Sequence, residues 1–337
     1  MLRAYFLLAA CACSTLGAPG ALGEPRSLLH DDVSRSAEDT DASFPVDAVF
    51  SWVDSTRPDW RQAFERETGQ PFANGPRWNT AFDPELELAQ SIKLVWRNMP
   101  WVRRVIVVAF GGQQPQPVNL RMFQSGRELT VHHEAIGLAP HAVFNSVSVE
   151  SALHHIPGLS EHFIYLNDDM YVIRPLTRHH FFDDQRRPIV RNDQYAAGAD
   201  SPFARLNDQT AALIGSPAGT TDRHVPRAFT ISMLAAAEAD PLLRDPWAAT
   251  RACRVRYTCG DDEVYTLYAA GQLGMRNGTA VSESSIDPSR ALRSFQQQHG
   301  LPSADELRRR HADVVCIEEP PDDTTREALD RALQVLN

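Results

Sequence analysis

The sequence predicts an α/β protein with a doubly wound, mostly parallel sheet and helical additions. Residues 162–166 present apolar side chains to both faces of the pleat, which is typical of a central parallel strand buried on both sides. Strand and helix candidates alternate along the chain, as in a doubly wound sheet. With 337 residues and 43% hydrophobic composition, the chain can bury a full core, as one large domain or as one domain with a subdomain.

Each expected element follows from apolar periodicity and from the residues that bound it. Pro157 and Gly158, for example, separate a helix from the central strand. The expected strands are residues 46–53, 104–110, 129–133, 162–166 and 314–316. The expected helices are residues 85–98, 146–155, 226–238 and 261–270, with a terminal helix from Thr324.

The amino terminus is typical of a leader segment. Residues 1–23 predict a signal peptide or signal anchor, because the stretch after Arg3 carries no charge and closes with small residues. Polar residues and Pro19 interrupt its apolar core, which favours cleavage over a permanent membrane helix. Residues 8–11 also match a bacterial lipoprotein cleavage pattern. A secretory route is expected, and membrane attachment through this segment stays open.

The remaining chain divides into a stem, one large folded unit and a tail. Residues 24–43 are polar and acidic and predict a flexible stem. The folded unit is expected at residues 44–320, with a loop-rich insertion or lid at 174–222. Residues 321–337 are expected to form a C-terminal helix.

Charge and cysteine content narrow the partners and the compartment. The net charge of −10, without any run of Lys or Arg, weighs against nucleic acid as a partner. Cys253 and Cys259 can form a disulfide across a short loop in an oxidising compartment, which leaves Cys316 as the third thiol after the leader. Oligomeric state leaves no signature in the sequence.

Acidic side chains follow two of the predicted strands. Asn167, Asp168 and Asp169 emerge at the carboxyl end of the central strand, where ligands of open α/β sheets bind. Their oxygen donors suit Mg²⁺ or Mn²⁺, although turn capping is the alternative for aspartates after a strand. Asp54 ends another strand at the same edge and either binds a nucleotide ribose or base or caps a turn. A phosphate-handling enzyme is the first hypothesis.

Motif-like residues occur in four regions between residues 46 and 319. They are residues 47–54; then Glu87, Leu88, 100–103, His133, 144–146, Glu150, 156–159 and 165–169; then 224–226, Arg256, Asp262 and Glu263; and finally 316–319. In this order the chain resembles the Stealth family of sugar-phosphate transferases, which includes bacterial capsular polysaccharide phosphotransferases and the catalytic subunit of the lysosomal-enzyme N-acetylglucosamine-1-phosphotransferase. The resemblance implies a Rossmann-like fold of nucleotide-sugar transferase type.

Three positions depart from the family pattern. Lys93 stands where the family usually has arginine. Arginine can bind a phosphate or carboxylate through two parallel hydrogen bonds, whereas lysine offers only a point charge. Val255 stands where a phenylalanine usually precedes the arginine of the third region. Glu318 and Glu319 replace an Asn-Asp pair and add a methylene at an expected ligand position.

The resemblance also implies roles for single residues. His224 is expected to accept the proton of the acceptor hydroxyl, and Arg256 to clamp a phosphate. Other implied catalytic residues are Asp168 and Glu150; the implied donor-binding residues are Asp54, Lys93, Asn145 and Asn167; the implied metal ligands are Asp168, Asp169 and Glu319. His154 and His155 are interpreted as ordinary histidines.

The implied reaction is the transfer of a sugar 1-phosphate from a nucleotide-diphosphate sugar, most often UDP-N-acetylhexosamine, to a hydroxyl of a polysaccharide or glycoprotein glycan. A nucleoside monophosphate is released, with Mg²⁺ or Mn²⁺ as cofactor. Two alternatives stay open: a conventional glycosyltransferase that releases UDP, and a catalytically silent glycan-binding protein. Animal relatives act in the Golgi and bacterial relatives often in the cytoplasm, and the leader favours the Golgi lumen or export.

Overall fold

The computed structural model describes residues 44–69, 71–72, 84–115, 127–138, 143–195, 200–297, 309 and 311–317. The expected leader, stem and C-terminal helix lie outside the described residues, as do Glu318 and Glu319. Of the helices in the described part, none combines the length and the apolar character that a membrane crossing needs.

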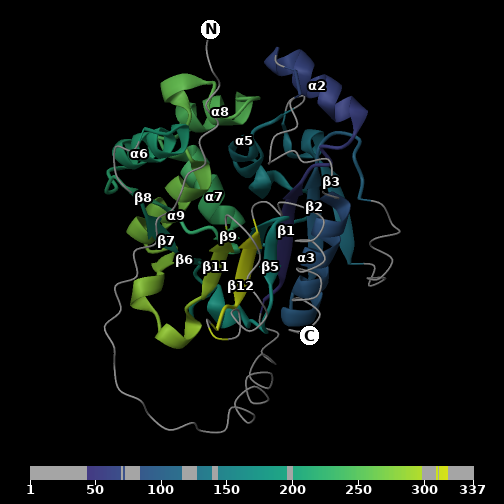
Figure 1. Cartoon of the computed structure of the whole chain (residues 1–337). Helices are drawn as coiled ribbons and strands as arrows, with labels where there is room; N and C mark the ends of the chain where they lie inside the picture. Colours follow the sequence, from purple (N-terminus) through teal and green to yellow (C-terminus); the bar gives the residue numbers. More distant parts are fainter. Residues whose placement is uncertain are drawn as a thin grey trace.

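A central sheet of mostly parallel strands organises the described chain (Figure 1). Its strand order is β3 (Glu128–His132), β2 (Arg104–Ala109), β1 (Val46–Trp52), β4 (His162–Asn167) and β9 (Arg227–Thr230). The first four strands are parallel, and β9 runs antiparallel to β4. The predicted α/β fold with a mostly parallel sheet is therefore confirmed.

Both faces of this sheet are buried under packed side chains. Successive side chains of a strand point to opposite sides of the sheet, so alternate residues enter different cores. On β4, Phe163 and Tyr165 enter one core, whereas Ile164 and Leu166 enter the other. Helix α3 (Pro84–Asn98) covers the second core. The first core lies under α5 (Ser146–Glu150), α6 (Pro202–Ile214), α7 (Ile231–Ala239), α8 (Arg244–Ala252) and α9 (Thr266–Asn277), grouped on one side in Figure 1.

Smaller elements surround the main sheet. Helix α2 (Pro58–Thr68) follows β1. A three-stranded sheet joins β11 (Ser294–Gln297), β12 (Val314–Ile317) and β5 (Met170–Val172), so the expected strand at 314–316 is confirmed. Two-stranded sheets pair β10 (Val281–Ser282) with β6 (Ile189–Val190) and β7 (Asn192–Gln194) with β8 (Thr220–Asp222).

The structure corrects several expected elements. The helix expected at 226–238 is strand β9 followed by α7, because residues 227–230 are buried and pair with β4. The insertion at 174–222, expected to be loop-rich, holds α6. The helix expected at 146–155 stops at Glu150 and resumes as the 3₁₀ helix η4 (Leu153–His155). The helix expected at 261–270 begins at Thr266 and ends at Asn277. Helices α2 and α8 were not predicted.

A buried carboxylate fixes the amino-terminal edge of the sheet. Asp47 on β1 is fully buried and accepts hydrogen bonds from Arg103 Nε and Nη2 at 2.8 and 2.7 Å. It also accepts the backbone N–H of Ser160, just before β4, at 2.8 Å. One side chain thus ties β1 to the start of β2 and to the segment that enters β4.

Replacing this carboxylate should destabilise the protein. Asp47→Ala removes several charge-assisted hydrogen bonds and leaves the Ser160 N–H unpaired, so we expect the free energy of unfolding to fall by about 2 to 4 kcal/mol. Urea unfolding followed by circular dichroism measures this loss. Asp59→Ala is the control, because the Asp59 side chain is 58% exposed in its pair with Arg57 and should contribute less than about 1 kcal/mol. Equal losses in the two variants would contradict the role of Asp47.

Candidate active site

The carboxyl ends of β1 and β4 meet where the strand order changes direction. Strands β2 and β3 extend the sheet on one side of β1, whereas β4 lies on the other side. Asn167 ends β4 opposite Ser51 of β1, and Asp168 and Asp169 form the turn into β5. Ligands of open α/β sheets bind at such a switch point. The two aspartates therefore lie at the edge of the sheet where a donor molecule is expected.

His224 reaches the same edge because β9 runs antiparallel to β4. Tyr165 pairs with Arg227, so the chain three residues before Arg227 lies beside the end of β4. The Asn167 Nδ2 and His224 Nε2 atoms are 3.2 Å apart. The structure thus brings two of the predicted site residues into direct contact.

Cys316 joins this pair from β12. It lies opposite Met170 of β5, next to the aspartate turn. Its thiol donates to Asp169 Oδ2 at 3.4 Å, and its Sγ is 3.2 Å from His224 Nδ1. A thiol that donates to Asp169 accepts the Nδ1 proton of His224, which leaves Nε2 as the acceptor facing Asn167. This tautomer is the one that a general base at Nε2 requires.

Glu87 on α3 adds a third carboxylate. Burial raises its pKa well above the ordinary value, and the negative charges of Asp168 and Asp169 raise it further. The Tyr171 hydroxyl donates to Glu87 Oε1 at 3.5 Å. Burial and the same carboxylates also raise the pKa of Tyr171. Sequence reasoning quoted Glu87 as part of a motif and gave it no role, although its place in that motif was the available signal.

These side chains fit a hard divalent cation. Glu87, Asp168 and Asp169 offer carboxylate oxygens, and the buried Oδ1 atom of Asn167 makes no hydrogen bond within the described part of the chain. Mg²⁺ and Mn²⁺ prefer such oxygen donors. A bound cation would also offset the repulsion that raises the pKa of Glu87. Glu319, the other expected ligand, lies outside the described residues.

A buried ion network lies beneath this cluster. Arg227 donates to Glu150 Oε1 at 3.3 Å, to Asp222 Oδ2 at 3.1 Å and to the Tyr265 hydroxyl at 3.1 Å. Its guanidinium also lies 5.1 Å from the centre of the Tyr165 ring. Glu150, expected to be catalytic, therefore joins α5 to β9 through Arg227. Sequence reasoning missed Arg227 because it placed this residue in a helix.

Burial also perturbs Asp222. It raises the pKa of this carboxyl to about 6; Arg227 opposes the shift, and the Glu150 charge adds to it. The carboxyl is thus held close to a change of protonation state, two residues before His224.

The predicted disulfide is confirmed, and it shapes the loop that carries Arg256. Cys253 and Cys259 are joined, with their Cα atoms 5.9 Å apart. Asn145 caps α5 through its side-chain oxygen and donates from Nδ2 to the Cys253 carbonyl at 3.1 Å and to Glu263 Oε1 at 3.0 Å. Asn145, expected to bind the donor, thus anchors this loop.

The positive charge of Arg256 acts on Glu263 and on Tyr265. Burial raises the pKa of Glu263, and the hydrogen bond from Asn145 and the charge of Arg256 oppose that rise. Arg256 also lies 4.8 Å from the centre of the Tyr257 ring and favours ionisation of Tyr265. Arg256 is therefore connected to Arg227 through the shared neighbour Tyr265.

The two remaining donor-binding candidates have distinct surroundings. Asp54 follows β1; its Oδ1 accepts from Thr56 N at 2.9 Å, as in a capped turn, and its backbone pairs with the Gln113 side chain. Lys93 lies on α3 six residues after Glu87, which places it on a different face of the helix. Asp54 thus lies at the carboxyl edge of the sheet, whereas Lys93 belongs to another face of α3.

Comparison with known proteins finds a family match over the segment that carries the carboxylates. Residues 82–190 match Stealth protein CR2, conserved region 2, a span that includes Glu87 and the turn at Asp168 and Asp169. The chain therefore carries conserved region 2 of the Stealth proteins. His224 and Cys316 lie beyond the matched region.

Relatives of this chain are named as polysaccharide phosphotransferases. The exopolysaccharide phosphotransferase SCO6021 of Streptomyces coelicolor is 34% identical over 232 residues, which cover 64% of this chain and 41% of the relative. A capsular polysaccharide phosphotransferase of Neisseria meningitidis serogroup B is 36% identical over 168 residues, 48% of this chain and 44% of the relative. The chain thus spans less than half the length of these two relatives.

A solved structure of the galactosyltransferase LgtC, in complex with donor and acceptor sugar analogs, overlays on 86% of this chain and 95% of that chain. The TM-score is 0.43 at 14% identity, which is too low to support any conclusion about function.

Glu87→Gln should separate metal binding from stability. The change removes a negative charge from a repelling carboxylate cluster, so we expect Mn²⁺ affinity to fall about 10- to 100-fold, the range typical of residues that support a metal site. The thermal midpoint in EDTA should be no lower than that of the wild type. Isothermal titration with Mn²⁺ and thermal unfolding provide the two readouts. Glu65→Gln on the exposed side of α2 is the control, and unchanged Mn²⁺ affinity in Glu87→Gln would contradict the assignment.

Asp222 should make stability fall between about pH 4 and pH 6. Its folded pKa of about 6 exceeds the ordinary 3.8, so between these values the folded chain holds a proton that the unfolded chain releases. The favourable contribution is present below about pH 4 and is lost as the pH rises through about 6. Asp222→Asn should remove this fall of the free energy of unfolding with rising pH, which urea unfolding at several pH values measures. Asp200→Asn, with a 96% exposed side chain, should retain it, and a wild-type slope in Asp222→Asn would refute the assignment.

Proposed function

We propose that this protein is a Stealth-type enzyme that transfers a sugar 1-phosphate from a nucleotide-diphosphate sugar to a hydroxyl of a glycan and releases the nucleoside monophosphate. The observation that carries the proposal is the meeting of Asp169, Cys316 and His224 at the carboxyl end of β4, next to Asp168 and Glu87. The names of the relatives support phosphotransfer in general. A UDP-N-acetylhexosamine donor is the narrower form of the proposal.

The acidic side of the site would hold the cofactor. Glu87, Asp168 and Asp169 are the residues that would bind Mg²⁺ or Mn²⁺, with Asn167 beside them. When bound, such an ion neutralises charge on a diphosphate and on its leaving oxygen. Phosphoryl transfer needs little covalent chemistry from the protein, so positioning and charge compensation account for most of the catalysis.

His224 supplies the proton transfer. Its Nε2 would take the proton of the acceptor hydroxyl while that oxygen attacks the phosphorus bonded to the sugar. The bond from this phosphorus to the bridging oxygen breaks, and the nucleoside monophosphate leaves with the electron pair. Asn167 and Cys316 contact the two ring nitrogens and orient the imidazole.

The cationic side of the site depends on two arginines. Arg256 would contact the transferred phosphate, and the disulfide loop and Asn145 would fix its position. Glu150 would act on Arg227 rather than on substrate, because it is buried against that guanidinium. Asp54, at the end of β1, would face the nucleoside; Lys93 remains a candidate for donor binding from α3.

The compartment is a further part of the proposal. A disulfide persists in oxidising compartments, and the Cys253–Cys259 bond agrees with the secretory route expected from residues 1–23. We propose an exported or Golgi-lumenal enzyme, with the leader as its route and as a means of membrane attachment.

The nucleotide product tests the proposal. With UDP-N-acetylglucosamine, a glycan acceptor and Mn²⁺, we expect UMP and a phosphodiester in the product, both detected by mass spectrometry. His224→Ala should lower kcat about 10²- to 10⁴-fold, the usual contribution of a positioned base. His179→Ala, a half-exposed histidine paired with Asp184, is the matched control. Release of UDP would instead indicate a conventional glycosyltransferase, and equal inactivity of wild type and His224→Ala toward every donor would favour a glycan-binding protein.

A further inference from the structure

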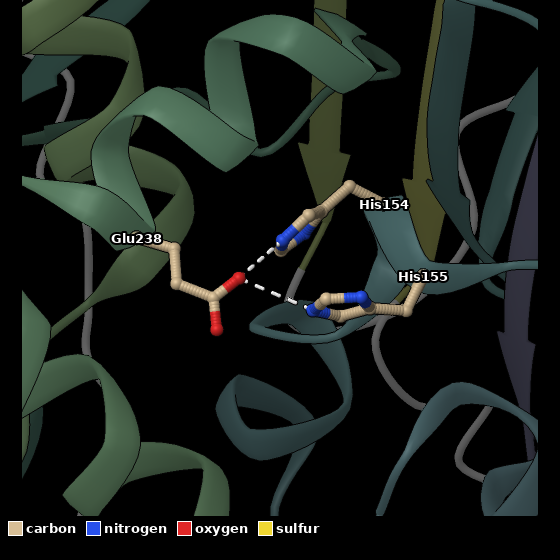
Figure 2. Close-up of side chains that lie close together, drawn as sticks. All are labelled: His154, His155 and Glu238. Carbon is tan, nitrogen blue, oxygen red and sulfur yellow. Dashed lines mark hydrogen bonds and ion pairs between the residues drawn. The ribbon is translucent and has the colours of Figure 1, made fainter.

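His154, His155 and Glu238 converge at a second place in the fold (Figure 2). The Nε2 atom of His154 is 2.6 Å from Glu238 Oε2, and the Nε2 atom of His155 is 3.1 Å from the same oxygen. The histidines come from η4, just before β4, and the glutamate from the last turn of α7. One ligand atom from each residue lies within 4.8 Å of the other two.

The other carboxylate oxygen of Glu238, Oε1, is bound by a neighbouring helix. Arg251 of α8 approaches Glu238 Oε1 at 2.6 Å and donates to the Ser151 carbonyl at 2.8 Å. Its contact fixes the carboxylate so that Oε2 faces the two rings. A ligating carboxylate whose second oxygen is held by a hydrogen bond is the usual arrangement around protein-bound metals.

The cluster combines a rigid inner side with an accessible outer side. The His154 side chain is only 3% exposed and lies against Trp247, with the ring centres 6.2 Å apart. The side chains of His155 and Glu238 are 43% and 27% exposed. An ion from solvent can therefore reach a site whose deepest ligand is already fixed.

We propose that His154, His155 and Glu238 form a zinc site that links η4 to α7. Two imidazole nitrogens and one carboxylate oxygen are a zinc ligand set that leaves a fourth position for water. Mg²⁺ favours sites of oxygen donors only, so this site differs in metal preference from the carboxylate cluster at β4. The bound ion would join the segment that enters β4 to the helix that follows β9.

The arrangement exceeds what charge balance requires. Arg251 already compensates the charge of Glu238, so neither ring is needed as a counter-ion. The two ring nitrogens and the carboxylate oxygen still lie within 4.8 Å of one another, which is close enough for them to bind one ion.

Metal binding by the full chain tests the proposal without any activity assay. The metal-free protein is titrated with Zn²⁺ by calorimetry and with Co²⁺ by visible absorption. Because Asp169, His224 and Cys316 also group closely, the Co²⁺ spectrum separates the sites: a thiolate ligand adds an intense ultraviolet band that a site of nitrogen and oxygen ligands lacks. We expect the wild type to show the Co²⁺ bands of a site with nitrogen and oxygen ligands, and we expect Zn²⁺ to raise its thermal midpoint.

Two variants and one control decide the outcome. His155→Ala, at the exposed ligand, should weaken Zn²⁺ binding at this site at least about 100-fold and abolish the corresponding rise in thermal midpoint. Glu238→Gln should do the same while it keeps the shape of the side chain. His179→Ala should bind as the wild type does. Equal Zn²⁺ stoichiometry and affinity in wild type and His155→Ala, or Co²⁺ bands with thiolate character only, would overturn the proposal.

Discussion

The pairing of β9 with β4 is the constraint on which the site depends. Tyr165 lies opposite Arg227 in this register, so His224 comes to the carboxyl end of β4 while Arg227 lies against Glu150 and Asp222. A slip of one residue would turn every side chain of β9 to the opposite face of the sheet. The buried Arg227 opposes such a slip, because a guanidinium away from its carboxylates would carry a large desolvation cost.

Charge compensation divides the site into an acidic side and a cationic side. Burial and the negative charges of Asp168 and Asp169 raise the pKa of Glu87, so a cation beside these three carboxylates would stabilise their charged forms. In the network beneath, Arg227 already supplies the positive charge for Glu150 and Asp222. The first cluster is therefore suited to a cation, whereas the second network stabilises the fold.

The sequence predicted the centre of the fold better than its additions. Residues 162–166 were recognisable as a central strand because both of their faces are apolar. The position of Asp168 and Asp169 at the carboxyl end of that strand could then be predicted. Strand β9 was mistaken for a helix because Pro226 resembles a helix start, and only its partner β4 makes residues 227–230 a strand. The roles of Glu87 and Cys316 depend on tertiary proximity to Asp169, which no spacing in the sequence encodes. Likewise, His154 and His155 looked ordinary because Glu238 lies more than eighty residues away along the chain.

The two halves of the candidate site come from different parts of the chain, and neither half suffices alone. The matched region at residues 82–190 supplies the carboxylates and Asn167, which we propose to bind a cation, whereas the proposed base lies outside it. His224 and Cys316 come from the later half, where Cys316 contacts both Asp169 and His224. A shift of Asp169 toward a cation would weaken the acceptor of the Cys316 proton and so alter the hydrogen bond at His224 Nδ1. Through this thiol, the acidic side is physically coupled to the orientation of the base, so the later half of the chain is as necessary to the proposed chemistry as the region that identifies the family.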